Sequence, residues 1–87
     1  MFTSVYDLRP LESQHQRSFY GKAMVLMLAD GTRVLRSYRT IVASISPDGA
    51  ISRHWDGWSA TTGRHVKAFC HMNKTDFESI PLTRAPL

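Results

Sequence analysis

The sequence predicts an α+β domain in which an antiparallel sheet of three or four strands carries one amphipathic helix on a face. Two turn signals predict the sheet, Asp-Gly at residues 30–31 and Ser-Pro-Asp-Gly at residues 46–49. Each contains a glycine, which adopts the positive φ that tight hairpin loops need, so the flanking strands form a meander. The third observation is a stretch from Ser59 to Met72 with apolar residues at helical spacing, which is typical of a helix docked on a sheet.

Length and composition indicate one small domain. A chain of 87 residues has room for a single thin core, which we place at residues 19–72, with peripheral segments at 1–18 and 75–87. No apolar run is long enough to cross a membrane, and the N-terminus lacks the basic start and apolar stretch of a signal peptide. The single cysteine excludes an internal disulfide. We therefore expect a cytoplasmic protein with no membrane partner.

The first hairpin is predicted around residues 30–31. The preceding run, residues 23–29, is apolar on both faces, which favours a central strand or one covered on both sides. A two-residue Asp-Gly loop would place Leu26 opposite Leu35 in the next strand.

The segment from Thr32 to Ser46 is longer than an ordinary strand of about 5–6 residues. We expect it to bend near residues 37–39 and to pair on both sides. Past the bend the residues alternate, and Ile41, Ala43 and Ile45 are predicted to face inward.

The second hairpin is predicted to have a three-residue loop, in which a type I turn precedes a glycine. This loop sets Ile45 opposite Ile51 and leaves Arg53 opposite Ala43. A two-residue loop would exchange the two faces of the sheet. We prefer the longer loop because it keeps the large apolar residues together.

Ser59 is the predicted N-cap of the main helix, and Thr61 or Thr62 would cap a later start. Gly63 inside the helix costs about 1 kcal/mol relative to alanine. Its presence indicates either a close approach by another backbone or a helix that begins after it.

The flanking segments are predicted to add short helices. One follows Pro10, which suits a first helical position. The other is capped by Thr75, ends before Pro81, and is expected to fold Phe77 and Ile80 back on the sheet.

No catalytic or metal-binding pattern stands out. The best zinc ligands by type are His54, His65, Cys70 and His71. Their spacing fits no known ligand set, and Cys70 is expected to be a buried free thiol. Asp56, Ser59 and His65 have the types of a nucleophilic triad, but no strained nucleophile turn surrounds the serine. We therefore predict a protein that is not an enzyme and takes no metal and no cofactor.

Charge is concentrated in the middle of the chain. Residues 33–67 contain six basic and two acidic side chains, a net charge of +4, which is the net charge of the whole chain. Guanidinium groups beside aromatic rings favour a phosphate backbone and stacked bases as ligands. A solvated face with both tryptophans in the core is the competing interpretation. The residues predicted to form the binding surface are Arg36, Tyr38, Arg39, Arg53, His54, Trp58, Arg64 and Lys67.

Three segments carry a resemblance, namely residues 19–23, 37–43 and 58–69. In outline, a Ser-Tyr-x-Thr strand segment precedes a Trp-Ser-x-Thr-Thr-x-x-His segment that opens a helix. These segments resemble a small domain of unknown function that recurs in proteins of bacteriophages and other mobile elements. The resemblance implies such an origin but brings no activity and no functional residue with it. The polar residues of the two patterns could equally form a network that fixes the strand to the helix.

Two functions are expected from these observations. The first is a small phage or mobile-element binding protein, acting in the host cytoplasm as an anti-defence or host-takeover factor. Its partner would be a host protein, or a nucleic-acid–protein complex, that handles nucleic acid. The alternative is direct nucleic-acid binding through the basic segment 33–67. The sequence sets no oligomeric state.

Overall fold

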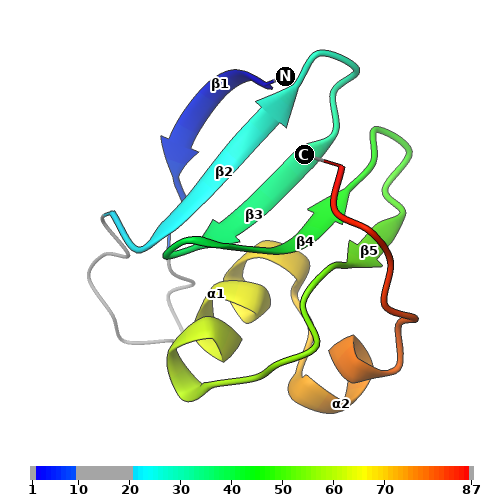
Figure 1. The fold of residues 1–87 in the computed structure, drawn as a ribbon. Coiled ribbons are helices and arrows are strands. Elements are labelled where there is room, and N and C mark those ends of the chain that lie inside the picture. Colours follow the sequence, from blue (N-terminus) through cyan, green and yellow to red (C-terminus); the bar gives the residue numbers. More distant parts are fainter. Residues whose placement is uncertain (1, 10–20, 87) are drawn as a thin grey trace.

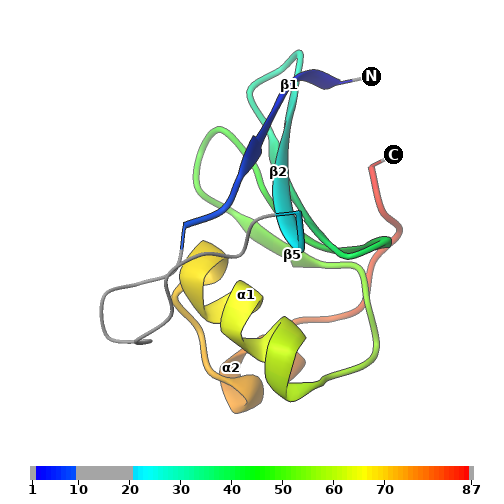
Figure 2. The ribbon, with the colours of Figure 1, turned by 90° about the vertical axis from the view of Figure 1, so that its left-hand side faces the viewer.

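The computed structural model describes residues 2–9 and 21–86 of the chain. Their elements are β1 (Phe2–Asp7), β2 (Ala23–Leu28), β3 (Arg33–Ser37), β4 (Thr40–Ile45), β5 (Ile51–Arg53), α1 (Ala60–Cys70) and α2 (Lys74–Glu78). The strands form one sheet in the order β1-β2-β3-β4-β5, every neighbouring pair antiparallel. Both helices lie on the same side of this sheet (Figures 1 and 2). The α+β meander with one main helix on a face is confirmed, with five strands where three or four were expected.

The additional strands have two sources. β1 is missing from the sequence prediction because its run, Phe-Thr-Ser-Val-Tyr-Asp, shows no sustained apolar alternation. The segment 32–46 makes a full reversal at Tyr38 and Arg39 where only a bend was expected, and its halves β3 and β4 pair with each other. The short helix predicted after Pro10 lies outside the described residues.

The first hairpin has a register one residue away from the predicted one. Leu28 N donates to Thr32 O (2.8 Å), so three residues form the loop and Leu26 lies opposite Val34. Gly31 is the last loop residue and has a φ of 94°. The prediction was wrong because Asp-Gly can fill the end of a three-residue loop as well as a two-residue loop.

The second hairpin has the predicted register. Ile45 lies opposite Ile51, and Ala43 lies opposite Arg53. Gly49 closes its three-residue loop with a φ of 93°. The β2–β3 and β4–β5 loops are thus built alike. Each has a glycine in the left-handed region after two turn residues.

Strand β4 contains one residue more than β3 across their shared ladder. Leu35 lies opposite Ala43 and Arg36 lies opposite Ile41, so the register skips Val42. This β-bulge changes which side chains meet the helices. Val42 is fully buried in the core, whereas Ile41 is only partly buried, which corrects the inward position predicted for Ile41.

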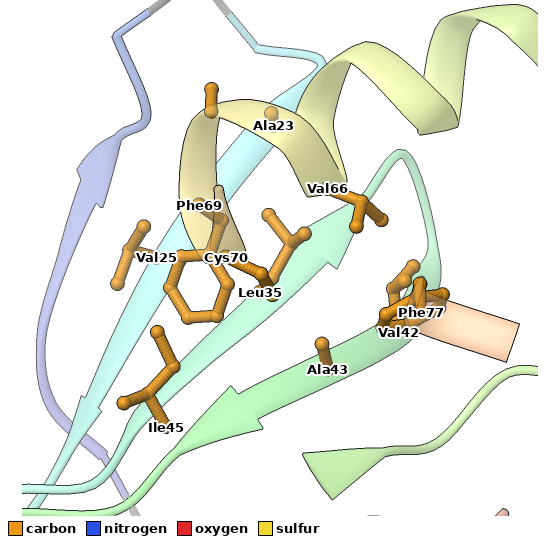
Figure 3. Close-up of a cluster of buried hydrophobic side chains, with 11 residues drawn as sticks. Ala23, Val25, Leu35, Val42, Ala43, Ile45, Val66, Phe69, Cys70 and Phe77 are labelled. Atoms are coloured by element: carbon orange, nitrogen blue, oxygen red, sulfur yellow. The ribbon is translucent and has the colours of Figure 1, made fainter. Parts of the chain in front are cut away.

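The core fills the space between the sheet and the helices (Figure 3). The strands contribute Leu35 and Val42 to it, among others, and α1 contributes Val66 and Phe69. Phe77 of α2 is fully buried in the same core cluster as the strand residues, and Ile80 packs against that cluster, so the predicted return of both residues to the sheet is confirmed.

Helix α1 has the predicted N-cap. The Oγ of Ser59 accepts a hydrogen bond from Thr62 N (3.1 Å). At the other end, His71 adopts the left-handed conformation (φ 59°) and donates its backbone N–H to Lys67 O (2.9 Å). The helix therefore ends two residues earlier than the Met72 boundary predicted from periodicity.

Gly63 is explained by a neighbouring side chain and not by another backbone. A Cβ at this position would lie 2.6 Å from a carbon of the Trp58 indole, a separation that real atoms do not adopt. The ring of Trp58 lies in turn 6.0 Å from the ring of Phe77, centroid to centroid. Because Gly63 has no side chain, the Trp58 ring can contact both α1, at Gly63, and α2, at Phe77.

The C-terminal segment covers the β5 edge of the sheet. Helix α2 begins after Asn73, whose Oδ1 accepts from Asp76 N (2.8 Å). Beyond it, Leu82 forms a parallel bridge with Arg53, and Thr83 N donates to Arg53 O (2.8 Å). These bonds satisfy backbone groups that an edge strand would otherwise leave open.

Candidate functional site

A pocket opens at the end of the sheet where β3 turns into β4. It encloses about 390 Å³ and is lined by Gly21, Arg36, Tyr38 and Arg39. We call these four residues the Tyr38 pocket. Three of them belong to the predicted binding surface, and they come from a single hairpin.

Tyr38 is held in an unusual conformation at the mouth of this pocket. It is the first of two residues that connect β3 to β4, and its φ is 55°. Hairpin loops of this length ordinarily place glycine, asparagine or aspartate at a positive φ, because a larger side chain is strained there. The backbone is fixed by a hydrogen bond from Tyr38 N to Lys22 O (2.7 Å). Half of the tyrosine is exposed, at 50% of its full area.

Two arginines line the pocket together with the tyrosine. Arg36 belongs to β3 and has a buried Nε for which the described residues supply no hydrogen-bond partner. Arg39 is exposed in the turn. Lys22 and Arg64 both act electrostatically on His65, whose ring lies 6.0 Å from the ring of Tyr38. The result is a surface of positive potential, suited to an anionic ligand.

One carboxylate lies at the same end. Asp7, at the end of β1, accepts a hydrogen bond at Oδ1 from Gly21 N (3.0 Å). Its charge is partly taken up by this backbone donor, which leaves the arginines of the turn to dominate the pocket.

A buried polar network lies beneath the pocket. The Oγ of Ser37 lies 2.7 Å from His65 Nδ1 and 3.1 Å from Thr62 Oγ1. The rings of His65 and Tyr38 lie 6.0 Å apart with a tilt of 44°. The network that the sequence offered as an alternative role for the Ser-Tyr-x-Thr and Thr-Thr-x-x-His patterns is therefore present, joining β3 to α1.

Burial controls the protonation of this network. His65 is fully buried. Removal from water lowers the pKa of His65 below its ordinary value of 6.5, and the charges of Lys22 and Arg64 lower it further. The ring is therefore neutral at physiological pH and exchanges one hydrogen bond with the Ser37 hydroxyl.

The structure does not bring Arg53 and His54 into the Tyr38 pocket. Arg53 Nε donates to Ile80 O (2.7 Å), and the guanidinium lies 3.6 Å from the carboxylate of Asp56. His54 bonds through Nε2 to Ser44 Oγ (2.8 Å) and through Nδ1 to Thr83 O (3.1 Å). Both side chains hold the C-terminal segment against the sheet.

The remaining predicted residues divide between the core and the helix surface. Trp58 is partly buried and packs against the core. Arg64 and Lys67 are exposed on α1 one turn apart, and neither lines the Tyr38 pocket.

The residues considered for a nucleophilic triad or a zinc site have structural roles in the fold. Ser59 caps α1, and His65 bonds to Ser37, so the serine, histidine and aspartate suggested by the sequence form no triad. Within the described part of the chain, no three histidine, cysteine or acidic side chains gather in a metal-binding arrangement. Cys70 is a buried free thiol, and burial raises its pKa to about 12, which keeps it unreactive.

One residue of the pocket and its neighbour in the chain are missing from the sequence prediction. Gly21 and Lys22 reach Tyr38 because β2 pairs with β3, with Ala23 opposite Ser37. A signal for the site is nevertheless present in the sequence. The reversal at Ser-Tyr-Arg-Thr lacks the glycine or asparagine that a two-residue hairpin turn favours.

The fold and the pocket define a small α+β domain with an open, positively charged surface at one end of its sheet. Comparison with protein families shows where it belongs. Residues 6–81 match the DUF8033 family, a family of unknown function, and the chain is a member of that family. Comparisons with curated proteins and with solved structures gave no match. In the described residues, neither helix has the length and apolar character that a membrane span requires.

Proposed function

We propose that this protein is a non-enzymatic binding protein that takes nucleic acid at the Tyr38 pocket. One observation carries the proposal, namely that a half-exposed aromatic side chain and two arginines of the same hairpin line one pocket. Positive side chains attract a phosphate backbone, and an aromatic side chain beside them accepts a base.

The arrangement of charge supports a phosphate-rich ligand. Arg36 and Arg39 line the pocket, and the charges of Lys22 and Arg64 reach His65. The Asp7 carboxylate accepts a hydrogen bond from Gly21 N. Each cation that contacts a phosphate releases counterions, so the affinity should depend strongly on salt.

The phage or mobile-element origin is a further part of the proposal and rests on the sequence resemblance. An anti-defence or host-takeover role on a nucleic-acid-handling host protein is the rival function. The same positive surface would then meet an acidic protein surface. The experiment below separates these two functions.

Fluorescence anisotropy with a labelled single strand of about 12 nucleotides tests the proposal between about 50 and 200 mM salt. Four cations predict a slope of about −2 to −3 in log affinity against log salt. Changing Arg36 and Arg39 together to Gln should reduce the magnitude of this slope by about 1.4.

A matched control removes two charges elsewhere. Lys74→Gln with Arg84→Gln should leave the slope unchanged, because both side chains are exposed and belong to α2 and the C-terminal segment. Arg9 is unsuitable as a control, since Leu8 N donates to Ala23 O (2.9 Å) and places that segment near the pocket.

Absence of binding at low salt would overturn the proposal. The rival function would then be supported if the protein captured a stoichiometric host protein from a nuclease-treated lysate. In that case the Arg36→Gln and Arg39→Gln variant should fail to capture it.

A further inference from the structure

We infer that Tyr38 stacks on an unpaired base, so that the ligand of the pocket is single-stranded nucleic acid with phosphates held by Arg36 and Arg39. This inference rests on the proposed function and deepens it. It specifies that the ligand is single-stranded and that Tyr38 is the residue that distinguishes a single strand from a duplex.

The first argument is the conformation of the turn. The chain places a tyrosine at a φ of 55°, where glycine or asparagine would be relaxed. Strain of this kind persists where surrounding structure holds it, and it concentrates at ligand-binding positions. Here the hydrogen bond from Tyr38 N to Lys22 O holds the backbone in place.

The second argument is exposure. A tyrosine that served packing alone would bury its ring, but Tyr38 keeps 50% of its area exposed while it lines the pocket. Its contact with His65, at 6.0 Å between ring centroids, orients the side chain from beneath. The position therefore presents an aromatic ring to solvent and does not withdraw it.

The third argument is what each form of nucleic acid offers. In a duplex the bases are stacked on one another, and a protein ring reaches them only after unstacking. A single strand presents the face of every base, and stacking on a ring tolerates any sequence. The pocket, at about 390 Å³, is on the scale of a small-molecule site and matches one unpaired base more closely than a double helix.

The test changes Tyr38→Asn and measures two quantities. Asparagine relaxes the left-handed backbone, so Tm should stay the same or rise, while the Kd for oligothymidine should weaken about tenfold. Tyr38→Trp should keep the affinity, since it keeps the ring. A fall in Tm with unchanged affinity would show that Tyr38 is structural and would overturn the inference.

An abasic oligonucleotide of the same length supplies a second readout. It keeps the phosphates and removes the bases, so it should bind the natural protein about tenfold more weakly than oligothymidine. Tyr38→Asn should then have no further effect on the abasic strand. The salt slope should be the same in the natural protein and in the Tyr38→Asn variant, because the arginines are untouched.

A duplex of the same length separates this inference from the proposed function. If the duplex binds as tightly as the single strand and Tyr38→Asn changes neither, the stacking role is excluded while nucleic-acid binding stands. If no nucleic acid binds, both are excluded.

Discussion

Two serine–histidine pairs contribute to the fold, one between β3 and α1 and one between β4 and the residue that follows β5. Ser37 Oγ lies 2.7 Å from His65 Nδ1, and Ser44 Oγ lies 2.8 Å from His54 Nε2. The residue types and distances are nearly the same. The surroundings differ, because His65 is fully buried and His54 is partly exposed.

This difference decides what each pair contributes. In the core pair, water cannot replace a lost hydrogen-bond partner, so losing one side chain leaves the other with an unsatisfied buried polar atom. These hydrogen bonds therefore fix α1 to β3. In the outer pair, the second bond of His54 goes to Thr83 O at 3.1 Å, where water is available to take over. Similar hydrogen bonds therefore stabilise the whole fold in one place and a terminal segment in the other.

The largest expected effect comes from His65→Ala. It opens a cavity and leaves the buried Ser37 hydroxyl without its ring partner, so the free energy of unfolding should fall by about 3 kcal/mol. Urea denaturation followed by circular dichroism measures this change. A loss below about 1 kcal/mol would mean that the core pair is no more important than the outer one.

Lowering the pH should also destabilise the fold through His65, by less than the His65→Ala substitution does. The folded-state pKa of His65 is lowered, so the unfolded chain binds the proton more readily. Its contribution to stability is complete above pH 6.5 and is lost as pH falls below this value toward the folded pKa. The slope for one proton is at most about 1.4 kcal/mol per pH unit.

Denaturation midpoints from about pH 7.5 to about pH 5.5 measure this loss. His65→Gln should flatten the dependence, since glutamine does not titrate. An equal loss of stability in that variant would place the pH dependence elsewhere.

The smallest effect is expected from His54→Ala. The free energy of unfolding should fall by about 1 kcal/mol or less, because His54 is partly exposed and its bond to Thr83 O is near solvent. The amide of Thr83, which donates to Arg53 O, should exchange faster with deuterium. Core amides of α1 should keep their protection, and loss of that protection would contradict the local role.

Local features of the fold could be predicted from the sequence, and features set by distant pairing could not. The N-cap at Ser59 and the loop that ends in Gly49 depend on a few neighbouring residues, which the sequence displays. The predicted register of the first hairpin was wrong because Asp30-Gly31 suits two loop lengths, and a difference of one loop residue shifts the register. The Val42 bulge has no signature in a run of β-branched and small residues.

The candidate site shows the same division. The sequence identified Arg36, Tyr38 and Arg39 as a unit because they are near neighbours in the chain. It included Arg53 because charge can be counted from a sequence, whereas the carbonyl of Ile80 that engages its Nε can be found only in the fold.

The contact between Trp58 and Gly63 has a spectroscopic consequence. Trp55 and Trp58 are the two tryptophans of the chain; both pack against the core, and Trp58 contacts Gly63 of α1 and Phe77 of α2. Intrinsic tryptophan emission should therefore report the docking of α1 and α2 on the sheet.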